Sequence, residues 1–205
     1  MKKSISVLIV LMLSAFTALQ AASYTVVFMG DSITELWLNY HRDSYFTPNA
    51  YLGKGISGQT TAKMMARFKS DVTAYKPKAV VIMAGTNDIA RNDGYVPYEK
   101  IVENIMKMAA MAEEAGAKVA IISVLPADAF WWNTSLRPAG QLRRLNTILQ
   151  QKTLENGYVW VDMYPAMLAR GGAIDPTLSD DAIHPNPKGY ELMEQIIQPY
   201  LEEML

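Results

Sequence analysis

Short apolar segments alternate along this chain with longer segments in which apolar residues recur every three or four positions. Most of the apolar segments are bounded by Gly or Pro and rich in aliphatic residues, as in the buried strands of a parallel sheet. They cover residues 24–29, 49–52, 79–84, 118–124 and 158–161. The segments with helical spacing cover residues 33–40, 60–75, 96–115, 138–156 and 187–204.

This alternation predicts an α/β fold. Strands separated by helices of this length favour a parallel sheet with helices on both faces. Five strands fit the flavodoxin-like order 2-1-3-4-5. No linker or change of composition divides residues 23–205, so we expect one domain there.

The first 22 residues have a different pattern. Two lysines, Lys2 and Lys3, precede an apolar stretch from about Ile5 to Leu19, and small residues follow at Ala21 and Ala22. This order is typical of a secretory signal peptide, and the stretch is shorter than the ~20 residues of a membrane-spanning helix. We therefore expect residues 1–22 to be cleaved and the protein to be exported, periplasmic or extracellular, without stable membrane insertion. An uncleaved membrane anchor is the alternative.

Composition excludes several kinds of site. The net charge is −1 and no long run of one sign occurs, which argues against nucleic acid as a partner. The chain has no cysteine, so cysteine nucleophiles, disulfides and Cys-based zinc sites are excluded. With His41 and His184 as the two histidines, we do not expect a His-rich metal site either. Oligomeric state is not specified by these features.

Three polar segments carry the chemistry of a serine hydrolase. Residues 30–33 (Gly-Asp-Ser-Ile) and 85–88 (Gly-Thr-Asn-Asp) each follow a predicted buried strand, and residues 181–185 read Asp-Ala-Ile-His-Pro. The carboxyl ends of parallel strands meet at one edge of an open sheet, where ligands bind. A serine, an asparagine and an Asp-x-x-His pair are therefore expected to meet there.

Each side chain suits one task in ester hydrolysis. Ser32, at the turn after the first strand, is the candidate nucleophile, although serine also commonly caps helices. His184 is the candidate base, and Asp181, three residues earlier, can orient its ring. The neighbouring Asp180 is an alternative carboxylate. His41 is an alternative base.

An oxyanion requires hydrogen-bond donors. The amide of Asn87 is one candidate, although asparagine is also common in tight turns. Residues 53–58, Gly-Lys-Gly-Ile-Ser-Gly, offer a glycine N–H as a further donor. The same residues match the G-x-G-x-x-G pattern of dinucleotide sites, and they include Ser57 as a rival nucleophile. Ser57 does not lie in a G-x-S-x-G sequence, however.

In order and spacing, these segments resemble the sequence blocks of the SGNH/GDSL hydrolase family. The resemblance spans essentially the whole chain after residue 22 and implies Ser32 as nucleophile. It matches Asp181 and His184 to the orienting acid and the base. The oxyanion donors it implies are Gly58 and Asn87, together with the N–H of Ser32.

The resemblance further implies an α/β/α sandwich that hydrolyses esters through an acyl-enzyme without a cofactor. Gly55, three residues before Gly58, is a second candidate for the oxyanion glycine. Gln59 departs from the family pattern, because many relatives carry an acidic residue there.

The substrate is predicted from location and from one aromatic segment. Trp131 and Trp132 follow the fourth strand, where a loop borders the predicted cleft, and such rings stack on sugars or line acyl pockets. We expect short-chain, O-acetyl esters on carbohydrate or another small molecule. A lysophospholipase or acyl thioesterase acting on longer chains is the main alternative, and a non-enzymatic binding module is a third.

Overall fold

The computed structural model describes residues 24–205, which are built around a five-stranded parallel sheet. Its order is β2-β1-β3-β4-β5, which confirms the predicted 2-1-3-4-5 arrangement. The strands are β1 (Val26–Gly30), β2 (Tyr51–Gly55), β3 (Ala79–Ile82), β4 (Lys118–Ile122) and β5 (Val159–Val161). The predicted signal peptide, residues 1–22, lies outside the described residues.

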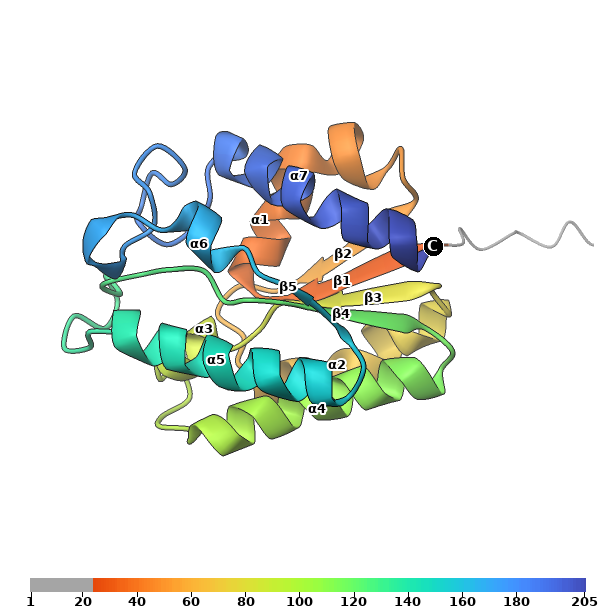
Figure 1. Ribbon diagram of the computed structural model, residues 1–205, viewed down its shortest axis with the longest axis horizontal. Coiled ribbons are helices and arrows are strands. Elements are labelled where there is room, and N and C mark those ends of the chain that lie inside the picture. Colours follow the sequence, from red (N-terminus) through yellow and green to blue (C-terminus); the bar gives the residue numbers. More distant parts are fainter. Residues whose placement is uncertain (1–23) are drawn as a thin grey trace, which may run out of the picture.

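Helices cover both faces of the sheet, which confirms the three-layer α/β/α sandwich (Figure 1). On one face lie α1 (Ser32–His41) and α7 (Pro187–Met204). On the other face lie α2 (Thr61–Asp71), α4 (Tyr98–Glu114) and α5 (Ala139–Glu155). Two short helices, α3 (Thr86–Ile89) and α6 (Tyr164–Met167), follow β3 and β5 and were not predicted. Among the described residues, no helix has both the length and the apolarity needed to cross a bilayer.

The predicted boundaries of β2 were wrong, because the strand includes two glycines. The strand begins at Tyr51 and continues through Gly53 to Gly55, whereas residues 49–52 were expected. Glycine weakens an isolated strand, but here α1 crosses β2 too closely for a side chain. A Cβ atom at Gly55 would lie 2.1 Å from the backbone nitrogen of Glu35.

Two helices also differ from the prediction at their ends. The helix expected over 60–75 ends at Asp71, because Val72 leaves helical geometry (φ −126°, ψ −70°) and a short 3₁₀ turn follows. The helix expected over 96–115 begins at Tyr98, with Pro97 as its N-cap. Because proline has no backbone N–H, it disfavours a helix interior, which is consistent with a helix that begins directly after Pro97.

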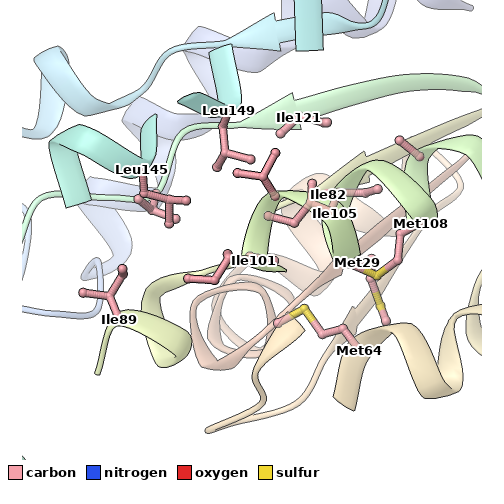
Figure 2. Close-up of a cluster of buried hydrophobic side chains, with 14 of the residues drawn as sticks. Met29, Met64, Ile82, Ile89, Ile101, Ile105, Met108, Ile121, Leu145 and Leu149 are labelled. Carbon is pink, nitrogen blue, oxygen red and sulfur yellow. The ribbon is translucent and has the colours of Figure 1, made fainter. Parts of the chain in front are cut away.

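The larger part of the apolar core lies between the sheet and α2, α4 and α5. Figure 2 shows side chains of the three central strands meeting side chains of these helices. The labelled strand residues are Met29, Ile82 and Ile121, and the labelled residues of the three long helices are Met64, Ile101, Ile105, Met108, Leu145 and Leu149. Because β1 and β3 are buried throughout, the loops after them start from fixed positions.

Candidate active site

Ser32 is the first residue of α1 and lies directly beyond the carboxyl end of β1. The N-cap is Asp31, whose Oδ1 accepts a hydrogen bond from the N–H of Ile33 at 3.0 Å. The capping role considered for Ser32 therefore belongs to its neighbour. The Ser32 hydroxyl lies at the wall of a cavity of about 310 Å³.

Ser32, His184 and Asp181 form a hydrogen-bonded series, in which Ser32 and His184 line this cavity. His184 Nε2 lies 2.8 Å from Ser32 Oγ, and His184 Nδ1 lies 2.6 Å from Asp181 Oδ2. The second carboxylate oxygen, Oδ1, accepts hydrogen bonds from the amides of Ile183 and His184, at 2.9 and 2.7 Å. The imidazole is thus held by the carboxylate on one side while its other nitrogen faces the serine.

These hydrogen bonds keep Asp181 ionised. Partial burial acts to raise the pKa of the carboxyl, but the hydrogen bonds from the His184 ring and from the two amides outweigh it. The net result is a pKa below the usual value for aspartate. Asp181 therefore carries its negative charge at neutral pH, where it can stabilise an imidazolium.

The structure does not bring the alternative residues to this series. Asp180 is exposed, and its carboxylate accepts from Asn186 Nδ2 at 3.3 Å. His41 is buried between α1 and α7, with Nδ1 2.7 Å from Glu194 Oε1. The same oxygen accepts from Trp37 Nε1 at 2.9 Å. His41 therefore joins two helices.

Asn87 lies in α3, just beyond the carboxyl end of β3, and its amide is fully hydrogen-bonded. Nδ2 donates to Asp31 Oδ2 at 3.2 Å and to the carbonyl of Gln59 at 3.1 Å. Oδ1 accepts from Asn92 Nδ2 at 2.8 Å. An oxyanion bound at Asn87 would therefore have to replace or share one of the two longer hydrogen bonds.

The loop after β2 distinguishes between the candidate glycines. Gly58 lines the cavity and has φ +75°, whereas Gly55 is packed against α1. The G-x-G-x-x-G pattern is thus explained by the structure, because Gly53 and Gly55 both pack too closely against α1 for a side chain and Gly58 has a positive φ. Ser57 donates from its N–H to Glu35 Oε2 at 2.7 Å and from its hydroxyl to the same oxygen. The Ser57 hydroxyl is thereby committed to Glu35.

Arg67 of α2 ties this loop to the sheet. Its guanidinium donates to the carbonyl oxygens of Gly30 and Lys54, both at 3.0 Å, and to Gln59 Oε1 at 2.6 Å. Gln59, the departure from the family pattern, thus accepts a hydrogen bond from a cation. Neither Arg67 nor Glu35 was predicted, because their partners are distant in sequence or are backbone atoms.

Asp31 has an unusual environment for a carboxylate. It is 3% exposed, and burial raises its pKa to about 6, although the hydrogen bond from Ile33 and the nearby His184 act in the opposite direction. Burial also raises the pKa of Asp88, which accepts from the hydroxyl and amide of Thr61 at 2.7 and 2.9 Å.

The two tryptophans both lie at the cavity but differ in their surroundings. Trp131 is 66% exposed, whereas Trp132 stacks on Phe130 and donates from Nε1 to Asn92 Oδ1 at 2.9 Å. Trp131 also lines a second cavity of about 740 Å³, whose wall includes Arg137 and Asp181. The lining of the first cavity consists of Ser32, Leu36, Ser57, Gly58, Asn87, Asn92, Trp131, Trp132 and His184.

Asn92 was missed by sequence reasoning. It lies in an exposed turn after α3. Its separation of five residues from Asn87 was the one sequence feature that could have indicated contact with that side chain. No cluster of His, Asp and Glu side chains between residues 24 and 205 is arranged to hold a metal ion.

Comparisons with known proteins agree with this geometry. The model of the GDSL-like lipase/acylhydrolase family matches residues 28–192. The solved structure of a GDSL-like lipase from Bacteroides thetaiotaomicron is 38% identical and superposes with a TM-score of 0.85. That match covers 88% of this chain and 88% of the other.

Two curated relatives match over shorter stretches. An acetylxylan esterase from Xylanibacter ruminicola is 28% identical over 145 residues, which are 62% of this chain and 29% of that protein. The uncharacterized lipoprotein YqeF from Bacillus subtilis is 31% identical over 93 residues, which are 44% of this chain and 38% of that protein. The matched stretches span less than two fifths of either relative.

Proposed function

Because the chain belongs to the GDSL-like lipase/acylhydrolase family, we propose that it is a serine esterase that hydrolyses carboxylic esters through an acyl-enzyme. The observation that carries this proposal is the hydrogen-bonded series from Ser32 through His184 to Asp181. These are the three residues that the sequence resemblance matched to the base, the orienting acid and the nucleophile, and their hydrogen bonds support those roles.

In the first half of the reaction, Ser32 Oγ attacks the acyl carbon while His184 Nε2 takes the hydroxyl proton. Asp181 holds the proton on Nδ1 and stabilises the imidazolium that forms. As the tetrahedral intermediate collapses, the imidazolium returns its proton to the leaving alcohol. Water then attacks the acyl-enzyme by the same route and releases the acid.

Negative charge on the carbonyl oxygen is stabilised by three donors, namely the N–H groups of Ser32 and Gly58 and the amide of Asn87. The N–H of Ser32 belongs to the first turn of α1, where the helix dipole also favours negative charge. One of the long hydrogen bonds of Asn87 is exchanged for a hydrogen bond to the oxyanion. The bond to Gln59 O and the bond to Asp31 are the two available for this exchange.

We propose short-chain esters, O-acetyl groups on carbohydrate in particular, as the substrates. The small cavity beside Ser32, bordered by two indole rings, supports this assignment. The acetylxylan esterase among the relatives supports it as well. The basic start and apolar stretch within residues 1–22 support export, as does the lipoprotein relative.

A series of p-nitrophenyl esters tests the proposal. We expect kcat/KM to be highest for acetyl to butyryl esters and to fall for longer chains, and acetylated xylo-oligosaccharides to be hydrolysed as well. In a deep acyl channel each further methylene would instead add ~0.8 kcal/mol of binding. Highest efficiency on octanoyl esters would favour the lysophospholipase or thioesterase alternative.

Matched variants test the roles of the residues. Ser32→Ala should lower kcat about 10⁴-fold or more, whereas Ser70→Ala on the exposed face of α2 should retain activity. Asp181→Asn should also lower kcat strongly, while Asp180→Asn should not. Near wild-type activity in Ser32→Ala would contradict the proposal, and absence of hydrolysis by the wild-type protein would favour a binding module.

A further inference from the structure

The side chain of Asn92 forms hydrogen bonds to one side chain and to one backbone carbonyl of the proposed oxyanion site. Its Nδ2 donates to Asn87 Oδ1 at 2.8 Å and to the carbonyl of Gly58 at 3.2 Å. Its Oδ1 accepts from Trp132 Nε1 at 2.9 Å. A single side chain thus contacts two of the three proposed oxyanion donors and an indole at the cavity wall.

The direction of these hydrogen bonds follows from Trp132. An indole N–H can only donate, so the oxygen of the Asn92 amide must face Trp132 and its nitrogen must face Asn87 and Gly58. The nitrogen in turn requires the oxygen of the Asn87 amide to face it. The Asn87 nitrogen is therefore left on the side of Asp31, Gln59 and the cavity.

The opposite orientation of Asn87 would be unfavourable on both sides. Its oxygen would face two acceptors, Asp31 Oδ2 and the Gln59 carbonyl, and its nitrogen would face the nitrogen of Asn92. The hydrogen bond from Asn92 is the shortest of the three made by the Asn87 amide. It is therefore well placed to hold the amide while its nitrogen exchanges a longer bond for the oxyanion.

We propose that Asn92, oriented by the indole N–H of Trp132, is a positioning residue that keeps the Asn87 amide and Gly58 directed toward the oxyanion. This inference rests on the esterase function proposed above. It assigns Trp132 a polar role, whereas Trp131 remains available to contact the substrate.

Kinetics on p-nitrophenyl acetate test the inference with Asn92→Leu, which removes the amide at similar side-chain volume. We expect kcat to fall about 10- to 100-fold with little change in KM, less than the ~10²–10³ typical of losing a donor itself. Trp132→Phe, which keeps an aromatic ring for stacking on Phe130, should lower kcat about fivefold. Asn39→Leu, on the exposed surface of α1, is the control and should keep wild-type kinetics.

A double-mutant cycle then shows whether Asn92 acts through Asn87. We expect Asn92→Leu to have little further effect on kcat when it is combined with Asn87→Ala. Losses that multiply, or a rise in KM with unchanged kcat, would overturn the inference, because Asn92 would then contact the substrate independently. If Asn92→Leu fails to fold, the combination of Trp132→Phe with Asn87→Ala gives the same test.

Hydrogen exchange provides a measurement that needs no substrate. The side-chain amide signal of Asn87 can be assigned by its loss in Asn87→Ala, and its exchange should become faster in Asn92→Leu. Unchanged exchange would overturn the inference. Failure of wild-type protein to hydrolyse esters would contradict the proposed function. The exchange rate of the Asn87 amide could still be measured in that case, because it does not depend on hydrolysis.

Discussion

Asp31 caps α1 and places a buried acidic group next to Ser32, the proposed nucleophile. Its two oxygens accept hydrogen bonds from Ile33 N and from Asn87 Nδ2, so the carboxylate links the start of α1 to α3. The same burial raises its pKa from 3.8 to about 6. The ionised form is therefore less stable in the folded protein than in the unfolded chain, and Asp31 lowers stability at neutral pH.

The stability contribution of Asp31 should depend on pH in a defined direction. The folded protein holds the proton more tightly, so this contribution is most favourable below about pH 4 and is lost as the pH rises to about 6. A pKa shift of this size corresponds to about 3 kcal/mol. Urea unfolding of wild type and Asp31→Asn at pH 4 and pH 7 should show that the stability of the wild type relative to the variant is lower at pH 7 than at pH 4.

Asp31→Asn is best compared with wild type as a difference at each pH. The new amide nitrogen would face that of Asn87, which adds a cost that is the same at both pH values. A difference in the free energy of unfolding that does not change between pH 4 and pH 7 would contradict the raised pKa of Asp31.

Elements and their order could be predicted from the sequence, because apolar spacing is a local signal. Buried β1 and β3 consist of consecutive apolar residues, so their existence and their parallel pairing followed directly. The extent of β2 could not be predicted, because Gly53 and Gly55 interrupt the apolar pattern. The reason for these glycines is the close approach of α1, which only the tertiary structure reveals. Site residues show the same difference between local and tertiary signals. Ser32 and His184 could be predicted because they lie in recognisable motifs, whereas Asn92 could not, because it lies in an ordinary turn.

Two glycine substitutions test how closely β2 and α1 approach. At Gly55 a Cβ atom would overlap backbone atoms of α1, at 2.1 Å from Glu35 N and 2.6 Å from Asp31 O. We expect Gly55→Ala to destabilise the protein by about 3 kcal/mol or more and to lower activity, because Ser32 begins the displaced helix. Thermal unfolding and p-nitrophenyl acetate hydrolysis measure the two effects.

Gly140 in α5 is the matched control for this substitution. Apart from its chain neighbours and the backbone of its own helix, no atom lies within 4 Å of a Cβ atom placed there, and the backbone is helical. Gly140→Ala should therefore stabilise the protein by up to about 1 kcal/mol without changing activity. Equal effects of the two substitutions would show that the contact between β2 and α1 is looser than described.

At the scale of the whole molecule, Trp131 separates two cavities. The smaller, of about 310 Å³, contains the Ser32 hydroxyl, and the larger, of about 740 Å³, lies along Arg137 and Asp181. The space around Trp131 thus extends well beyond what an acetyl group occupies. The proposed preference for esters whose alcohol part is larger than the acyl part is consistent with this space.

Trp131→Ala should accordingly affect large and small substrates differently. Loss of a stacking surface worth up to about 1.5 kcal/mol should lower kcat/KM about tenfold on acetylated xylo-oligosaccharides, and much less on p-nitrophenyl acetate. Trp132→Ala should lower kcat on both, because it also removes the donor to Asn92. Equal losses on both substrates in Trp131→Ala would exclude the stacking role.

The proposed nucleophile and its proposed base are 152 positions apart, with Ser32 just after the first strand and His184 just before α7. During synthesis every residue up to His184 must leave the ribosome before these two residues can meet. The helix that follows His184 also contributes Tyr190, whose hydroxyl donates to the carbonyl of Ile33 at 2.8 Å. Docking of α7 thus joins two segments that are distant in sequence beside Ser32. We therefore expect a chain that stops before His184 to be inert toward esters, and recovery of hydrolysis after unfolding to report the docking of α7.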